Sequence, residues 1–146
     1  MTRMIKYMIA CYATCLVFSV QAAVCSINVI GINFGAYYVA NTTPLDGSGT
    51  IDVSCDARTA FEVSFSTGLS GTYTTRQMAY GSSRLNYNLY RNAAMNRILG
   101  DGTGNTQVFS VNNARNRSFT VYGRVPAQQN VYVGSYADNV TVTLTF

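Results

Sequence analysis

The stretch Val140-Thr-Val-Thr-Leu-Thr-Phe146 decides the fold of this 146-residue chain. Apolar residues alternate in it with threonine at every step. Side chains of a strand point to opposite faces with a period of two, so one face here is wholly apolar and the other wholly hydroxyl. β-branched and aromatic residues suit such a half-buried pleated surface, whereas a helix would scatter them around its circumference. The stretch is therefore predicted to be a β-strand.

This strand stands at the end of the sequence, so no later segment is available to pair with it. An unpaired strand edge exposes backbone N–H and C=O groups that can pair with another chain. We therefore expect one edge of the fold to need a partner from elsewhere.

The first 22 residues have the features of a secretory signal peptide. Arg3 and Lys6 form a positive start, residues 8–20 are mostly apolar, and Val20-Gln-Ala22 suits a signal peptidase. We predict cleavage after Ala22 and a single mature domain at residues 23–146. The alternative is a membrane anchor, but the apolar run is short for a bilayer, so no membrane span is expected after cleavage.

The basic residues of the predicted mature chain are dispersed. Removing Arg3 and Lys6 with the signal leaves eight arginines against six acidic residues, and they form no run. Nucleic-acid binding would favour clustering on one face, so no nucleic-acid partner is expected and the arginines are interpreted as solvated surface charges. They are Arg58, Arg76, Arg84, Arg91, Arg97, Arg115, Arg117 and Arg124.

Two cysteines, Cys25 and Cys55, remain when Cys11 and Cys15 leave with the signal. An even pair normally closes in an oxidising compartment, so we predict a disulfide between them. Closing a loop of about 30 residues contributes roughly 3–4 kcal/mol in the chain-entropy account. Two isolated cysteines without histidine cannot complete a tetrahedral zinc site, and no metal or cofactor is expected.

Alternating apolar residues and turn formers continue along the mature chain. A change of parity at Ile30-Gly31 indicates a bulge or a change of pairing partner, and turns are predicted at residues 35–49 and 56–59. Roughly seven short strands without a convincing helix predict an all-β fold, an antiparallel β-sandwich of immunoglobulin type. The strand candidates are residues 25–34, 50–55, 61–65, 85–90, 106–111, 119–125 and 140–146, with residues 76–80 as a weaker candidate and residues 131–136 as a short one interrupted by Gly134.

The residue types needed for most catalytic sites are missing. The chain has no histidine, and its one lysine leaves with the signal. Ser–His–Asp and Cys–His nucleophiles are therefore excluded, and so is a lysine base. A carboxylate pair is the remaining alternative, but Asp52 and Glu62 are predicted on outward faces, and Asp101 suits a turn better than a calcium site. We expect no enzyme.

Tyrosines are the other conspicuous residues, since amphipathic rings suit both binding surfaces and sandwich cores. Tyr87, Tyr122 and Tyr136 are predicted in the core. Tyr37 and Tyr38 follow the first strand in a loop and are predicted as exposed contacts with a surface or partner.

Several motifs in order resemble the spore coat protein U domain family, which includes the pilins of archaic chaperone–usher fibres. The resemblance runs from Cys25 to the last residue and includes the strand that ends in Cys55. Its other motifs are Phe34-Gly-Ala-Tyr37, Leu85-Asn-Tyr-Asn-Leu-Tyr-Arg91, Gly100-Asp-Gly102, Val121-Tyr-Gly-Arg-Val-Pro-Ala-Gln128 and Gly134-Ser-Tyr-Ala-Asp-Asn-Val140 with the terminal strand.

The resemblance implies an incomplete immunoglobulin-like sandwich that awaits a donor strand. A periplasmic chaperone would lend that strand first, and a neighbouring pilin subunit would replace it during assembly through an outer-membrane usher to the cell surface. Fibre-forming members usually carry an N-terminal extension that they donate, whereas only Ala23 and Val24 precede Cys25 here. The resemblance therefore favours a subunit that accepts a strand, as at a fibre tip.

Apolar strands at both ends of the mature chain are expected to line the groove for this donor strand. The groove residues are predicted to be Ile27, Val29, Ile32, Phe34, Val140, Val142, Leu144 and Phe146. The alternative function is a secreted coat or surface-binding module that completes its own sandwich.

Overall fold

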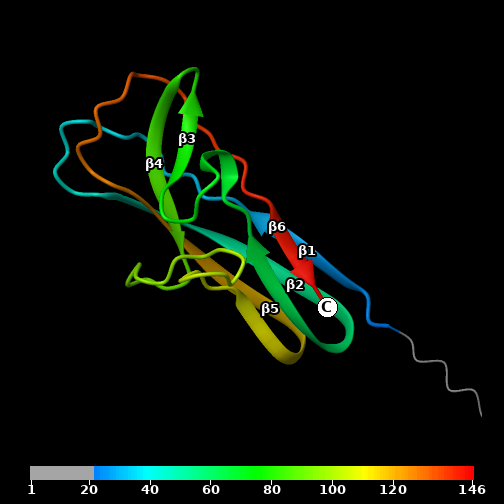
Figure 1. The fold of residues 1–146 in the computed structure, drawn as a ribbon. Helices are drawn as coiled ribbons and strands as arrows, with labels where there is room; N and C mark the ends of the chain where they lie inside the picture. Colours follow the sequence, from blue (N-terminus) through cyan, green and yellow to red (C-terminus); the bar gives the residue numbers. More distant parts are fainter. Residues whose placement is uncertain (1–21) are drawn as a thin grey trace, which may run out of the picture.

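The structure, a computed structural model, describes residues 22–146, and the predicted signal peptide up to residue 21 lies outside the described residues. All strand pairings are antiparallel, and residues 22–146 contain one 3-10 turn but no α-helix, as the all-β prediction requires. The elements in order are β1 (Cys25–Ile30), β2 (Leu45–Phe65), η1 (Gly68–Ser70), β3 (Arg76–Tyr80), β4 (Ser83–Tyr90), β5 (Phe109–Val125) and β6 (Val142–Thr145) (Figure 1).

β2 and β5 form a long two-stranded ribbon on which the rest of the fold is built. Their register shifts between Ser54 and Thr59 and again between Thr59 and Phe61. Irregularities of this kind bend a strand and increase its twist. Figure 1 shows the ribbon turning back on itself there, so its two halves lie in different layers of the sandwich.

This ribbon corrects two predictions. The turn expected at residues 56–59 is wrong, because β2 continues through it as an irregular stretch that still pairs with β5. The separate strands expected at residues 106–111 and 119–125 are likewise joined in β5, which begins at Phe109 rather than at residue 106. Polar residues at a bend resemble a turn in sequence, but here β2 pairs with β5 again after the bend, from Thr59 onward. The loop predicted at residues 35–49 also ends early, since β2 begins at Leu45.

β1 and β6 pair with the same edge of β2, because β5 occupies its other edge on both sides of the bend. β1 pairs with residues 50–55 and β6 with residues 62–65. The bend lies between these two sites, and β1 and β6 therefore belong to opposite layers. The predicted disulfide is present and joins register partners of β1 and β2, Cys25 and Cys55.

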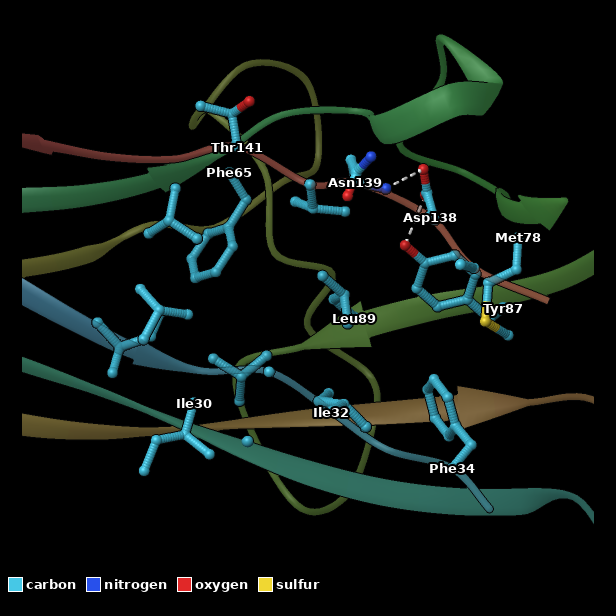
Figure 2. Close-up of a pocket in the computed structure, with 18 of the residues that line it drawn as sticks. Ile30, Ile32, Phe34, Phe65, Met78, Tyr87, Leu89, Asp138, Asn139 and Thr141 are labelled. Carbon is cyan, nitrogen blue, oxygen red and sulfur yellow. Dashed lines mark hydrogen bonds between the residues drawn. The ribbon is translucent and has the colours of Figure 1, made fainter. Parts of the chain in front are cut away.

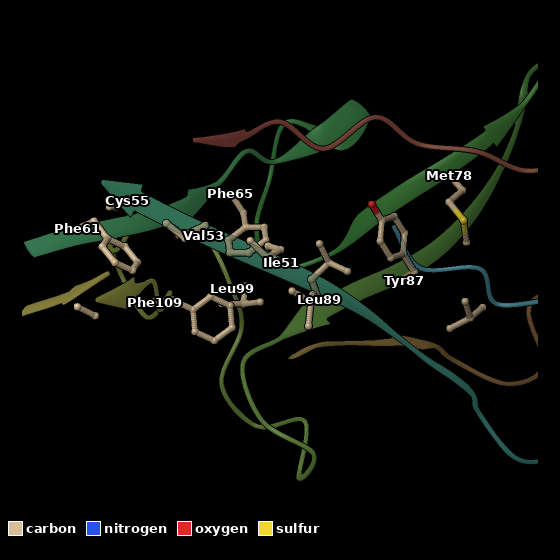
Figure 3. Packing of buried hydrophobic residues seen from close by; sticks show 14 of the residues in the cluster. Ile51, Val53, Cys55, Phe61, Phe65, Met78, Tyr87, Leu89, Leu99 and Phe109 are labelled. Atoms are coloured by element: carbon tan, nitrogen blue, oxygen red, sulfur yellow. The ribbon is translucent and has the colours of Figure 1, made fainter. Parts of the chain in front are cut away.

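The core fills the space between the layers (Figure 3). Alternate residues of β2 point inward before and after the bend, and β4 and β5 contribute the facing side chains. Phe109 stacks on Phe119 with ring centroids 4.5 Å apart and meets Phe65 edge-on at 6.0 Å. The buried apolar residues include Ile51, Val53, Phe61, Val63, Phe65, Leu85, Tyr87, Leu89, Leu99, Phe109, Val121 and Val125.

The strand predicted at residues 131–136 is wrong. The neighbouring edge of β4 is already satisfied, because the Gln129 side chain accepts a hydrogen bond from Asn86 N at 2.8 Å and donates one to Asn86 O at 2.9 Å. The edge of β3 is bridged instead by Ala137, which exchanges backbone hydrogen bonds with Ala79. Residues 131–136 therefore have no strand partner and run as an irregular segment.

Candidate functional site

A groove of about 420 Å³ opens between the segment that continues β1 and the segment that leads into β6. Residues 29–34 form its first wall and residues 136–142 its second wall, with core side chains between them (Figure 2). The buried core is therefore the floor of the groove. The floor residues are Ile51, Phe65, Met78, Tyr87, Leu89 and Val121.

Ile32 and Phe34 make the inner part of the first wall. They lie so close to Gly47 of β2 and Gly123 of β5 that a Cβ at either glycine would collide with them. Phe34 also meets the Tyr87 ring edge-on, with centroids 6.0 Å apart. Glycine in these strands thus allows the wall to approach the sheet backbone. The parity change at Ile30-Gly31 marks the end of β1 and the start of this crossing segment.

The outer part of the first wall is apolar but exposed to solvent. Val29 is 46% exposed and Ile30 is 59% exposed, although both line the groove. Apolar side chains gathered at the rim of a groove mark an interaction site more often than isolated ones do.

Two polar clamps hold the second wall. Ser66, the residue after β2, donates its N–H to Thr141 O at 2.9 Å, and its Oγ accepts from Thr141 N at 2.8 Å. Asp138 accepts a hydrogen bond from Tyr87 Oη at 2.7 Å (Figure 2). It accepts another from Leu69 N at 2.9 Å. Burial and the Asp138 bond raise the pKa of the Tyr87 hydroxyl well above its ordinary value, so this tyrosine remains a donor.

Both walls carry a strand with one unpaired edge. β1 and β6 each pair with β2, and neither has a second strand partner within residues 22–146. Backbone groups alternate in direction along an antiparallel strand. Since Thr141 bonds to Ser66, the N–H and C=O groups of Val140 and Val142 point the other way, toward the groove.

The structure brings five of the predicted groove residues together. Val29, Ile32, Phe34, Val140 and Val142 line the groove. Two others, Ile27 and Leu144, are half-buried against the core beside it, and Phe146 is exposed.

The tyrosines predicted as surface contacts lie near a second opening. Tyr37 is half-buried, and its hydroxyl is engaged internally, donating to Pro126 O and accepting from Gln129 N. Tyr38 is 64% exposed. Nearby, a cleft of about 640 Å³ is rimmed by Tyr132 and Val133, which are 80% and 99% exposed. The exposed apolar side chains that line this cleft, Val39, Tyr132 and Val133, are called the apolar rim.

Arg76 corrects the prediction that all arginines are solvated. It is the largest fully buried side chain in the described chain, at 0% exposure. Neither it nor Asp138 was predicted as part of the site. Arg76 shares its strand parity with the buried Met78, and this pattern indicates an inward side chain. No such signal exists for Asp138, whose partners are distant in sequence.

Within residues 22–146 no group of three or more His, Cys, Asp or Glu side chains could hold a metal ion. Over the same residues no helix is long and apolar enough to cross a membrane.

Comparisons with known proteins give one family and one informative structure. The family model described as the Spore Coat Protein U domain matches residues 12–143. The CsuC–CsuE chaperone–tip adhesion subunit pre-assembly complex, from archaic chaperone–usher Csu pili of Acinetobacter baumannii, aligns with a TM-score of 0.62 and 24% identity over 86% of this chain. The present chain spans only 40% of that one, and the likeness confirms an immunoglobulin-like sandwich.

Two further solved structures are more distant. The Hda pilus minor tip subunit HdaB of E. coli aligns with a TM-score of 0.44 and 16% identity, over 81% of this chain and 80% of that one. A chaperone–tip adhesin complex of CFA/I fimbriae aligns with a TM-score of 0.42 and 13% identity, over 82% of this chain and 42% of that one. Among curated proteins, none matches the sequence.

Proposed function

Because the chain belongs to the Spore Coat Protein U domain family, we propose that its groove accepts an extended strand from another protein and that it is a structural subunit of a surface fibre. The observation that carries the proposal is the pair of unpaired strand edges, β1 and β6, on either side of a groove floored by the core. An extended segment with alternating apolar residues would supply ladder hydrogen bonds to the edges and side chains to the groove.

The energy available is large relative to the stability of a small domain. Full burial of a Val, Leu, Ile or Phe side chain stabilises by about 1.5–3 kcal/mol. Each half-exposed wall residue that the donor strand buries would contribute about 1 kcal/mol, and each apolar side chain of the donor strand would add a similar amount. The sum is several kcal/mol. Net stabilities of native domains are only about 5–15 kcal/mol. The domain without a donor strand is therefore expected to be marginally stable, so that it stays folded in dilute solution and aggregates as its concentration rises.

The partners follow from the same proposal. A periplasmic chaperone lends the strand after export, and a neighbouring subunit replaces it as an outer-membrane usher adds the subunit to a fibre. The predicted signal at residues 1–22 provides the export step, and residues 23–146 form the assembled domain. Mass spectrometry of the exported protein checks this boundary, which places the new N-terminus at Ala23.

The test is periplasmic expression with and without a chaperone of an archaic chaperone–usher system. With the chaperone we expect a soluble complex of one copy of each protein, and without it little soluble protein. A stable monomer obtained alone, combined with no detectable complex, would refute the proposal.

The finer form of the proposal places the subunit at the fibre tip, the position named for the Csu relative of similar fold. Gold-labelled antibody against this chain should then mark fibre ends in electron micrographs. Labelling along the shaft would contradict it.

The apolar rim supports a second candidate function, contact with an apolar surface. Val133 and Tyr132 are almost wholly in water despite their apolar character, which is unusual for side chains without a contact role. Val133→Ser should reduce adsorption of the chaperone complex to a polystyrene surface, whereas Thr120→Ser, at an exposed site on β5, should not. Equal adsorption of the two variants would exclude this role.

A further inference from the structure

Arg76 opens β3 and is wholly buried, yet its guanidinium makes no salt bridge: the ion pair found within residues 22–146 is that of Arg124 with Asp46, and the Asp138 carboxylate acts on Arg76 only at longer range. Its guanidinium instead donates to neutral oxygens. Nη1 bonds to Asn88 Oδ1 at 2.8 Å and Nη2 to Leu99 O at 2.8 Å. Both Nε and Nη2 bond to Ser66 O, at 3.2 and 2.8 Å. The Tyr73 ring lies 5.3 Å from the guanidinium carbon.

Burying an arginine in this way is costly, and replacing a buried charge by apolar side chains often leaves stability unchanged or raises it. Arg76 therefore calls for a role other than stability. Its rigid fork of five donors can hold several carbonyl groups at fixed positions, which neither a lysine nor an apolar side chain can do.

The carbonyl that Arg76 holds twice belongs to Ser66, the residue that clamps the groove. Ser66 O faces Arg76, while its N–H and Oγ hold Thr141 of the second wall. One residue therefore connects the buried guanidinium to the terminal segment where β6 begins.

The second clamp lies beside the same network. Tyr87 and Leu69 hold Asp138, and Asn88, which Arg76 contacts, directly follows Tyr87 in β4. Asn88 Nδ2 in turn donates to the carbonyls of Tyr73 and Thr74, which fixes the loop before β3. The wall is held further by the paired backbone hydrogen bonds between Ala137 and Ala79 of β3 and by β6, which pairs with four residues of β2.

We propose that Arg76 is a positioning residue for strand acceptance: through Ser66 it fixes the second wall of the groove at the distance and register that an incoming strand requires. The inference rests on the proposed function for its biological role, but the positioning itself can be measured without a donor. The floor residues Ile51, Leu89 and Val121 make no polar contact with Arg76, so their packing should survive its loss.

Hydrogen–deuterium exchange on the disulfide-bonded domain tests the positioning. Arg76→Met keeps the length of the side chain and removes its donors. We expect the amides of Ser66, Leu69 and Thr141 to exchange at least tenfold faster, while amides of the β1–β2 ladder change far less. Arg76→Lys should restore part of the protection, because an ammonium can reach one carbonyl but cannot fork. The control is Arg84→Met, which removes an exposed arginine from the same hairpin and should change neither set.

Ser66→Ala is the second variant and covers the case in which Arg76→Met does not fold. It removes the Oγ that accepts from Thr141 N at 2.8 Å and from Gly68 N at 3.4 Å but leaves the carbonyl bonded to Arg76, so the amides of Thr141 and Gly68 should lose protection while that of Leu69 keeps it. Wall amides that exchange at the wild-type rate in folded Arg76→Met or Arg76→Lys protein would overturn the proposal. Equal acceleration over the whole domain in Arg76→Lys would overturn it too, because Arg76 would then be an ordinary core residue.

A donor titration separates this inference from the proposed function. The probe is a synthetic peptide of about nine residues with alternating isoleucine and threonine, long enough to span the second wall at about 3.3 Å per residue. We expect at least tenfold weaker capture by Arg76→Met than by Arg84→Met. If the wild-type domain captures no peptide while the exchange pattern appears as expected, the proposed function fails and the anchoring role of Arg76 stands. If the wild type captures the peptide and Arg76→Met captures it equally well, the anchoring role fails.

Discussion

Val142→Asp should leave the isolated domain folded and impair strand capture. Val142 lines the groove from the second wall and is only half-buried there, so a carboxylate at this position stays hydrated while the groove is empty. The next residue of β6, Thr143, is exposed, and Thr143→Asp therefore adds the same charge one step away without entering the groove.

The magnitude follows from what the donor strand covers. Loss of the valine contact costs about 1.5 kcal/mol. Removing water from a polar group without a hydrogen-bond partner costs about 1–3 kcal/mol more in proteins. Together the change is about 3 kcal/mol, which corresponds to a Kd raised roughly 100-fold or more, since each 1.4 kcal/mol is tenfold. In the empty domain Val142 is half-buried against the core, so the same substitution should lower the free energy of unfolding by about 1 kcal/mol, roughly half of what full burial of a valine contributes.

The assay is fluorescence anisotropy with a labelled peptide of alternating isoleucine and threonine. A peptide of the same composition with all isoleucines in one block is the control for non-specific binding. Urea unfolding of each empty variant measures stability separately. The penalty at Val142→Asp should shrink as the pH falls toward about 3.9, where an aspartate becomes neutral. Equal Kd values for the two aspartate variants would refute the assignment of this face of β6 to the groove.

Three further predictions concern stability. Cys55→Ala should lower the free energy of unfolding by roughly 3–4 kcal/mol, measured by urea titration against the oxidised wild type. Gly68→Ala and Gly71→Ala both place alanine at a positive φ, which costs about 1–2 kcal/mol. Only at Gly68 would the new Cβ collide with the Asp138 carboxylate. Gly68→Ala should therefore lower the Tm more than Gly71→Ala does. The hydrogen bond from Arg124 lowers the pKa of Asp46, so this exposed ion pair stabilises the fold above the unfolded pKa and stops doing so as the pH falls through the folded pKa. Asp46→Asn should therefore lower the free energy of unfolding by at most about 1 kcal/mol at pH 7 and should not change it in acid. An equal loss at both pH values would contradict this account.

The sequence predicted those features that depend on neighbouring residues. Alternation identified the inward faces before and after the bend of β2, for example Ile51 with Val53 and Phe61 with Val63. It failed where the local pattern was compatible with two structures. Residues 56–59 read as a turn, and only pairing with β5 decides that the strand continues. Residues 131–136 read as a strand, but a Gln129 side chain had already filled the adjacent edge.

The candidate site divides in the same way. Its apolar walls follow from strand parity and from the order of the segments along the chain, because each needs only the period of a strand. The polar network behind the second wall does not. Asp138 is far from Ser66 and Arg76 in sequence, and nothing in the sequence joins the three into one network. The bend of the β2–β5 ribbon brings them together, since it folds two layers over each other and places the end of β2 beside the start of β6. Local sequence therefore determined which strand faces are apolar, and only the tertiary structure decided that a buried arginine lies behind the second wall and is bonded to Ser66.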